Sequence, residues 1–224
     1  CVMQAVVQNP MADPYILGVS AGATLGATGS LFLGVGIVSG FWAFLGAGLA
    51  CFLVLALASA DGKTTSVKLI LAGMIVNALL TAFSNFIIAV AGNSDGIMSI
   101  KFWTMGSLTR AGWKNIGLIA VIVLLATIFF MSQARTLDGL LLGEEAAVTI
   151  GIDTFRCRLV YLLVLSLLTG ALISASGTIG FVGLIIPHLA RALVGTAHRR
   201  LLPVAALSGG LFMLWVDALA RSLL

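Results

Sequence analysis

Long apolar runs separated by short polar or glycine-rich connections dominate the chain. A membrane-spanning helix needs about 20 mostly apolar residues, or fewer when it is short and buried among neighbours. Gly40 alone separates the first two runs, which predicts a tight helical hairpin there. Residues 1–8 have the character of the tail of an earlier helix that Asn9 and Pro10 end. The predicted spans cover residues 17–39, 41–60, 67–91, 115–133, 158–175, a short stretch near 181–195, and 201–222.

Two connections are too long to be simple turns. Residues 92–114 combine glycines with Trp103 and Trp113, which predicts an interfacial helix on the outer side. Residues 134–157 carry acidic side chains together with Arg135 and Arg156. That composition is typical of short amphipathic helices on the cytoplasmic face, where another protein docks. The pattern therefore predicts an all-α, polytopic transmembrane helical bundle of about seven spans.

Composition supports a membrane protein and excludes a nucleic-acid partner. Hydrophobic residues make up 60% of the 224 residues and charged residues only 9%, whereas about a quarter of a soluble domain is charged. Too few polar side chains remain to cover a water-facing surface, so lipid is the expected solvent. The net charge of +4 forms no clustered basic face. We expect residues 1–224 to be one transmembrane domain that is an internal fragment of a longer chain.

The distribution of Lys and Arg predicts the orientation. If the N-terminal segment faces the cytoplasm, seven of these side chains lie inside and four lie outside. The inner group is Lys63, Lys68, Arg135, Arg156, Arg158, Arg199 and Arg200, and the outer group is Lys101, Arg110, Lys114 and Arg221. This excess favours a cytoplasmic N-terminal segment in the cytoplasmic (inner) membrane.

Residues 18–22 match a hydrolase motif but favour helix packing. The string GVSAG resembles the nucleophile elbow, which requires a strand-to-helix turn with acidic and His partners. Here it opens a hydrophobic helix in which small residues recur every fourth position. Such a stripe lets helices approach closely in lipid. The stripe consists of Gly18, Gly22, Gly26, Ser30 and Gly34.

Nucleotide and metal sites are weakly supported. The string GKT at 62–64 resembles the end of a phosphate-binding loop, but the glycine required at position 57 is a leucine. His188 and His198 have no Cys or carboxylate at ligand spacing. For His188, which follows Pro187 in a glycine-rich helix, a structural role is favoured over a metal ligand. We therefore predict no cofactor, no metal and no catalytic residue, and any ATP-driven work must use a partner.

Polar side chains inside the third span indicate a function. Asn77, Thr81, Ser84 and Asn85 fall within about a third of the helix circumference. Burying polar groups in lipid is costly and often functional, so this polar stripe is a candidate lining for a passage. Interhelical hydrogen bonding is an equally good explanation from the sequence alone.

Asp217 and Arg221 are four residues apart in the last span. This spacing places them on one helix face, where they form a local ion pair. Arg221 also lies at the predicted outer end of the span, where a cation suits an acidic partner from outside. Both interpretations stay open at this stage.

Motifs along nearly the whole chain resemble the permeases of iron-siderophore, haem and cobalamin ABC importers. The resemblance implies a ten-helix protomer, of which this chain holds the third to ninth helices, working as a homodimer with a pathway along the dimer axis. The similar segments are Asn9–Pro14 running on to Ser20, Leu69–Gly73, Phe102–Leu108, Leu142–Ala147 with Gly151 and Ile152, GTIGFVGLIIPHLAR at 177–191, His198 with Arg199, Leu202 with Pro203, and Asp217–Arg221.

The resemblance also implies partners and residue roles. Arg221 matches an arginine that pairs with a glutamate of the extracytoplasmic substrate-binding protein, and the polar stripe lies on the helix that lines the passage in the family. The implied cargo is a metal chelate, with a ferric siderophore as the leading case, moved by alternating access. A secondary transporter driven by an ion gradient is the alternative. The residues expected to dock on the ABC ATPase subunits are Gly143, Glu144, Glu145, Ala146, Ala147 and Gly151.

Overall fold

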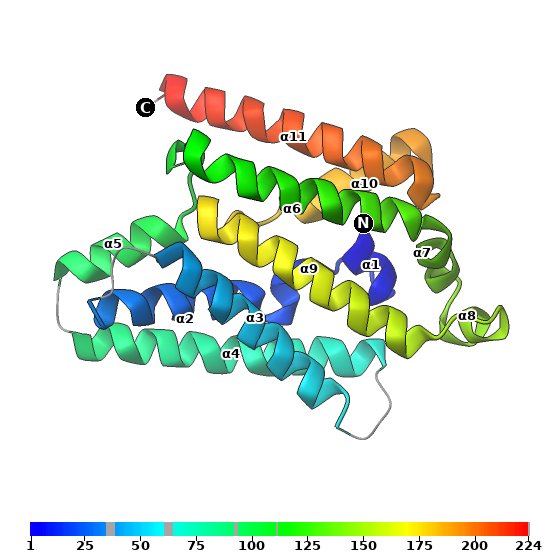
Figure 1. Ribbon diagram of the computed structural model, residues 1–224, viewed down its shortest axis with the longest axis horizontal. Coiled ribbons are helices and arrows are strands. Elements are labelled where there is room, and N and C mark those ends of the chain that lie inside the picture. The colour runs from blue at the N-terminus through cyan, green and yellow to red at the C-terminus, as the bar shows by residue number, and fades with distance from the viewer. Residues whose placement is uncertain (35–38, 61–64, 92–93, 111, 224) are drawn as a thin grey trace.

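The protein is a bundle of helices, as the sequence predicts. The computed structural model describes residues 1–34, 39–60, 65–91, 94–110 and 112–223, and it contains helices and no strand in those ranges (Figure 1). The α-helices are α1 (Val2–Val6), α2 (Val19–Phe32), α3 (Ser39–Ala58), α4 (Ser66–Ala91), α5 (Ser94–Thr104), α6 (Trp113–Ser132), α7 (Ala134–Leu141), α8 (Glu144–Thr149), α9 (Thr154–Ser176), α10 (Val182–Val194) and α11 (His198–Leu223), with 3-10 turns η1 (Pro14–Leu17) and η3 (Leu108–Arg110).

Not every predicted span is a full-length helix. Within the described residues, α3, α4, α9 and α11 are each long and apolar enough to cross a membrane. The pair α6 and α7 passes the same criterion together, with a bend of 62° between them. The interfacial helix predicted within 92–114 is present as α5, and the two short helices predicted within 134–157 are present as α7 and α8.

Helices α2 and α10 are too short to cross a bilayer alone. They have 14 and 13 residues, so each is about 20 Å long, less than the hydrocarbon thickness of about 30 Å. The residues preceding them meet, because the Tyr15 hydroxyl donates to the Ile179 carbonyl at 2.7 Å and accepts from the Ile179 N–H at 3.1 Å. The two half-length helices therefore begin side by side inside the bundle.

The predicted boundary between the first two spans is wrong. Helix α2 ends at Phe32 rather than near residue 39, and Gly40 lies inside the first turn of α3 rather than in the hairpin turn. A Cβ on Gly40 would lie 2.7 Å from the Ser174 carbonyl oxygen of α9. Gly40 is thus a contact between helices, and residues 35–38, which the first predicted span included, lie outside the described residues.

The centre of the bundle depends on close packing between α2 and α3. A Cβ on Gly22 would lie 2.2 Å from the Gly46 carbonyl oxygen, and one on Gly26 would lie 2.0 Å from the Trp42 carbonyl oxygen. No real Cβ atom fits at such distances, so the two backbones touch directly. The predicted packing stripe is confirmed at these two glycines, whereas a Cβ on Gly34 would meet nothing within 4 Å.

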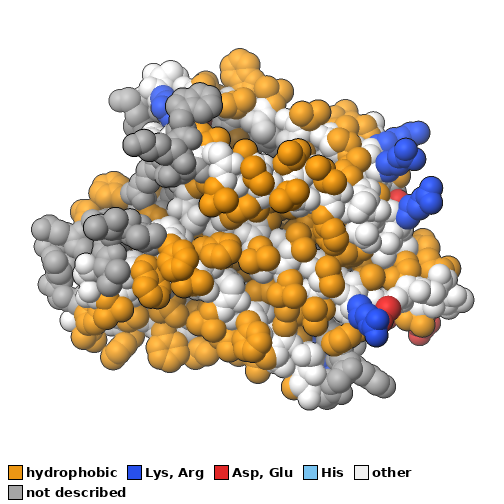
Figure 2. Space-filling model, in the orientation of Figure 1, with side chains coloured by type: hydrophobic (Ala, Val, Ile, Leu, Met, Phe, Trp, Pro, Cys, Tyr) orange, Lys and Arg blue, Asp and Glu red, His pale blue; other side chains and the backbone are white. Residues whose placement is uncertain are grey.

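Apolar side chains cover most of the visible surface, and charges gather at one end. In the view of Figure 2, most of the Lys and Arg side chains lie at the end from which α8 projects. Large side chains such as Phe86, Leu118 and Leu214 are exposed along the helices. An exposed apolar surface of this extent is matched by lipid rather than by water.

Candidate translocation cavity and docking surface

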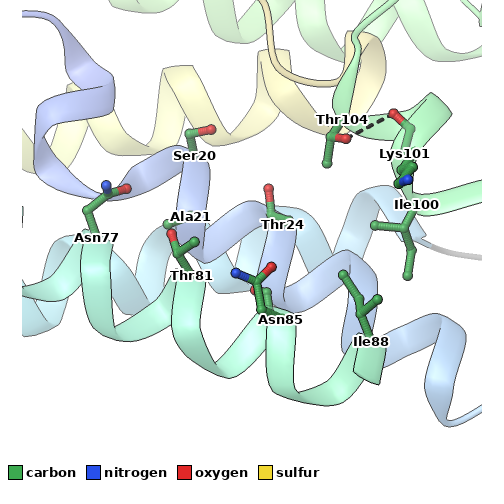
Figure 3. A pocket seen from close by; sticks show the side chains of 11 residues that line it. Ser20, Ala21, Thr24, Asn77, Thr81, Asn85, Ile88, Ile100, Lys101 and Thr104 are labelled. Carbon is green, nitrogen blue, oxygen red and sulfur yellow. Dashed lines mark hydrogen bonds between the residues drawn. The ribbon is translucent and has the colours of Figure 1, made fainter. Parts of the chain in front are cut away.

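A cavity of about 390 Å³ lies between α2, α4 and α5 (Figure 3). The four residues of the predicted polar stripe, Asn77, Thr81, Ser84 and Asn85, all line it. Because they recur along one face of α4, their side chains reach the same cavity. Figure 3 shows the α2 and α5 side chains around it. Helix α2 contributes Ser20, Ala21 and Thr24, α4 also contributes Ile88, and α5 contributes Ile100, Lys101 and Thr104.

Most polar groups of the stripe are not used to join helices. Ser84 is buried and donates its hydroxyl to the Leu80 carbonyl of its own helix at 2.9 Å. Asn77, Thr81 and Asn85 are exposed, and the structure shows no hydrogen bond from their side chains to any residue it describes. The amide and hydroxyl groups of these exposed side chains can therefore bind a molecule in the cavity. This favours the interpretation of the stripe as the lining of a passage over its interpretation as hydrogen bonding between helices of this chain.

Helix α8 projects from one end of the molecule (Figure 1). Gly143 before it has φ +104° and Gly151 after it has φ +86°, a backbone conformation that side chains with a Cβ rarely adopt. A Cβ at either glycine would meet nothing within 4 Å, so only the backbone geometry requires glycine. The two glycines therefore make the sharp turns that set α8 apart from its neighbours.

The predicted docking residues divide into an outward and an inward group. Glu145 is exposed and Ala146 is partly exposed, whereas Ala147 is fully buried and anchors α8 to the bundle. Leu142 and Val148 are 67% and 57% exposed, so apolar side chains surround the acidic one. An apolar centre with a charge beside it is typical of a protein contact surface.

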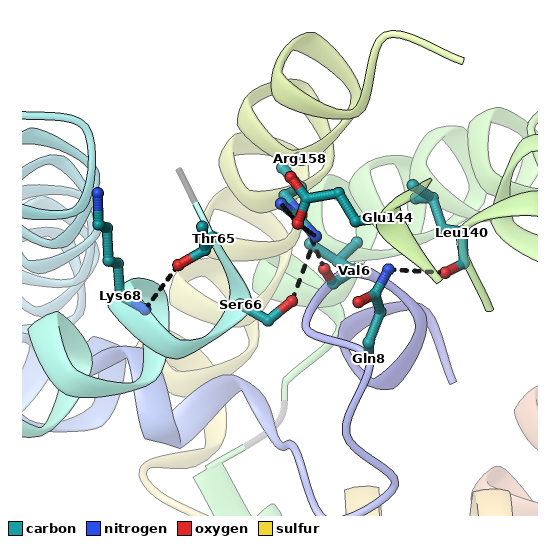
Figure 4. Close-up of polar contacts among 8 residues, drawn as sticks. All are labelled: Val6, Gln8, Thr65, Ser66, Lys68, Leu140, Glu144 and Arg158. Atoms are coloured by element: carbon teal, nitrogen blue, oxygen red, sulfur yellow. Dashed lines mark hydrogen bonds and ion pairs between the residues drawn. The ribbon is translucent and has the colours of Figure 1, made fainter. Parts of the chain in front are cut away.

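Glu144 faces both solvent and the bundle, with a side chain that is 42% exposed. Its Oε2 accepts from both Nη1 and Nη2 of Arg158 at 3.2 Å (Figure 4). Arg158 also donates from Nη2 to the Ser66 hydroxyl at 3.2 Å and from Nε to the Val6 carbonyl at 3.3 Å. The network joins α8, α9, the first residue of α4 and the end of α1.

The side chain of Arg158, which the sequence assigns to the cytoplasmic side, is buried, with 1% of its surface exposed. The sequence contained one usable signal, since Arg158 is the first residue of an apolar run rather than part of the connection before it. A charge at that position must find a partner once the helix packs. Which partner it finds depends on contacts between distant segments.

A second polar link joins α7 to α11 at the same end. The carboxylate of Asp138 accepts from the His198 N–H at 2.9 Å and pairs with the His198 Nδ1 at 2.6 Å. The His198 side chain is 1% exposed, so its imidazole lies inside the bundle. His188, on α10, is exposed instead.

At the far end of α11 the predicted ion pair is present. Arg221 Nε lies 2.8 Å from Asp217 Oδ2, and both side chains keep part of their surface exposed. Arg221 is therefore accessible, although Asp217 already neutralises part of its charge. Of the other basic residues predicted for the outer side, Lys101 lines the cavity, while the side chains of Arg110 and Lys114 lie outside the described residues.

A helical bundle with an apolar surface, and with a cavity beside the short helix α2 that is lined partly by polar side chains, is typical of a polytopic membrane transport protein. The chain belongs to the FecCD transport family, which matches residues 1–224, and the family resemblance of its motifs is thereby confirmed. It is a multi-pass protein of the cytoplasmic membrane.

Named relatives and a solved structure agree with this family. The chain is 41% identical to the cobalamin import system permease protein BtuC of Halobacterium salinarum, over 99% of this chain and 60% of that protein. It is 36% identical to the hemin transport system permease protein HmuU of Yersinia pestis, over 99% and 68%. A structure described as an inward-facing conformation of a metal-chelate type ABC transporter superposes with a TM-score of 0.91 at 33% identity, over 100% of this chain and 71% of that one. The chain thus spans less than two thirds of the length of the first of these relatives.

Proposed function

We propose that this chain is most of the membrane-spanning permease subunit of an ABC importer for metal chelates. In this mechanism, an extracytoplasmic binding protein delivers the chelate, and ATP hydrolysis on two ABC ATPase subunits switches a homodimer of the permease between outward and inward openings. The single observation that carries the proposal is α8, a rigidly held protrusion at the end of the molecule where the basic side chains gather. Residues 134–157 are then the cytoplasmic coupling loop.

The contacts of α8 indicate how a push from an ATPase would reach the passage. Glu144 holds Arg158, and Arg158 holds Ser66, the first residue of α4. The same α4 carries the polar stripe that lines the cavity. A displacement of α8 is therefore transmitted to the start of the helix on which the passage depends, without any bond being made or broken in the cargo.

The cargo is proposed from chemistry and from relatives. The relatives are named for cobalamin and hemin, which are both metal chelates. A ferric siderophore is our specific proposal for this chain, with Asn77, Thr81, Ser84 and Asn85 along its route. Amide and hydroxyl groups bind and release such a cargo more readily than tight ionic contacts would.

The first test is a pull-down of the tagged full-length protein in mild detergent. Glu145→Arg reverses an exposed charge on α8 and is expected to remove most of the co-purifying ABC ATPase, since like charges at a docking surface oppose association. Glu145 is preferred to Glu144, because changing Glu144 also disturbs the buried Arg158. Arg221→Glu at the far end of α11 is the matched charge reversal and should leave the ATPase bound.

Two results would contradict the proposal. The first is a protein that purifies without any ATPase and moves cargo with an ion gradient in liposomes, as a secondary transporter does. The second is equal ATPase recovery from the wild type and the Glu145→Arg variant, which would remove α8 as the docking element.

A further inference from the structure

The translocation cavity is lined by a positive charge, and no acidic side chain in the part of the chain that the structure describes lines it as well. Lys101 on α5 lines it, and none of its lining residues in the described part of the chain is Asp or Glu. The structure gives Lys101 no ion pair with any residue it describes. Among the described residues that line the cavity, Lys101 is the one charged side chain, so it contributes a positive local potential there.

The position of Lys101 is fixed by the helix end that carries it. The Thr104 hydroxyl donates to the Lys101 carbonyl at 2.9 Å, and the Thr178 hydroxyl donates to the Thr104 carbonyl. The Ser107 N–H also donates to the Ser176 carbonyl at 2.7 Å, just before the same connection. These bonds tie the last turn of α5 to the connection between α9 and α10, so the backbone that carries Lys101 is held beside the cavity.

We infer that Lys101 makes this cavity prefer metal chelates with a net negative charge over neutral ones. The inference rests on the proposed function and adds the charge class of its cargo. An ammonium group attracts carboxylate, phenolate or other anionic oxygens without demanding one geometry, because it acts as a compact point charge. The open hydroxyl and amide groups of Ser20, Thr24 and Asn85 then meet the remaining oxygens of the chelate.

Low-dielectric walls strengthen this preference. The cavity also contains Ala21, Ile88 and Ile100, and apolar side chains surround the bundle. Lys101 itself is exposed, so these walls strengthen its attraction for an opposite charge once a bound chelate displaces the water around it. A neutral chelate gains nothing from Lys101 and must leave its ammonium group hydrated.

The test compares the binding of an anionic chelate and of a neutral chelate to one preparation of the protein. The full-length permease with its co-purified ATPase is dialysed to equilibrium against radioactive iron as ferric citrate, which is anionic, or as a neutral ferric trihydroxamate. The wild type is expected to bind ferric citrate about five- to tenfold more tightly. Lys101→Met should abolish the difference, Lys101→Arg should keep it, and Arg200→Gln, a charge removed at the far end, should not change it.

Salt provides an independent readout. Added salt screens a charge-based preference, so the advantage of ferric citrate should shrink between about 50 mM and 500 mM salt. Wild type that binds neither chelate or binds both equally overturns the inference, and so does a Lys101→Met variant that keeps the full preference. The absence of ATPase from the same preparation would instead contradict the proposed function, so the two failures can be told apart.

Discussion

Arg158 illustrates how one buried charge organises several segments. Its side chain is 1% exposed, whereas that of its partner Glu144 is 42% exposed. Moving a charge out of water costs several kcal/mol unless a counter-charge and hydrogen bonds replace the water. Ser66 and Val6 supply part of that replacement. The ion pair is therefore asymmetric: Glu144 reaches water when Arg158 is removed, but Arg158 does not when Glu144 is neutralised.

This asymmetry predicts unequal effects of the two single substitutions. Glu144→Gln, which removes the charge of the Glu144 carboxylate from beside the buried cation, should destabilise the protein by about 3 kcal/mol. Arg158→Met should cost less, about 1–2 kcal/mol, because an aliphatic side chain fills part of the space and Glu144 becomes hydrated. Denaturant unfolding in detergent measures both, with Glu145→Gln as the neighbouring exposed control. The prediction is wrong if Arg158→Met proves the more damaging of the two.

At the scale of elements, the contact between α2 and α3 has no room for a side chain. Gly22 and Gly46 face each other, and a Cβ on Gly46 would lie 2.0 Å from the Gly22 carbonyl oxygen. Gly48, two residues along the same helix, has nothing within 4 Å of the corresponding position. Two glycines of one helix therefore differ in what they do, although the sequence around them looks alike.

Gly46 and Gly48 give a matched pair of predictions about stability. Gly46→Ala should force the helices apart and destabilise the protein by about 1–3 kcal/mol, the usual range for overpacking. Gly48→Ala should be neutral or slightly stabilising, because alanine is the better helix former at an open position. Thermal unfolding of both variants and the wild type in detergent measures the two changes in stability. Equal loss in both would mean that the helix contact tolerates a methyl group.

The sequence predicted elements and faces well, and contacts between distant segments poorly. Periodicity alone placed the stripe from Asn77 to Asn85 on one face of a helix, and the structure brings that face to one cavity. It did not reveal that Tyr15, just before α2, binds Ile179, because the two residues are 164 positions apart in the sequence. The burial of Arg158 was likewise hidden, since its carboxylate partner comes from another helix.

Taken as a whole, the molecule presents different chemistry at its two ends. One end carries α8 and most of the visible basic side chains, and Arg221 lies near the opposite end of α11. In an importer, the first end meets the ATPase and the second meets the binding protein. The separation predicts that a substitution at one end disturbs one partner and spares the other.

Arg221→Glu is the decisive substitution for the outer end. It replaces a cation by an anion beside Asp217, so capture of the acidic surface of a loaded binding protein should weaken by at least about tenfold. Asp217→Asn is the control, because it frees the Arg221 guanidinium from its local carboxylate and should keep or strengthen capture. Binding is measured on the full-length complex with immobilised binding protein, and ATPase recovery is measured on the same samples. Unaltered capture by Arg221→Glu would exclude the salt bridge, whereas loss of the ATPase in that variant would mean that the two ends are not independent.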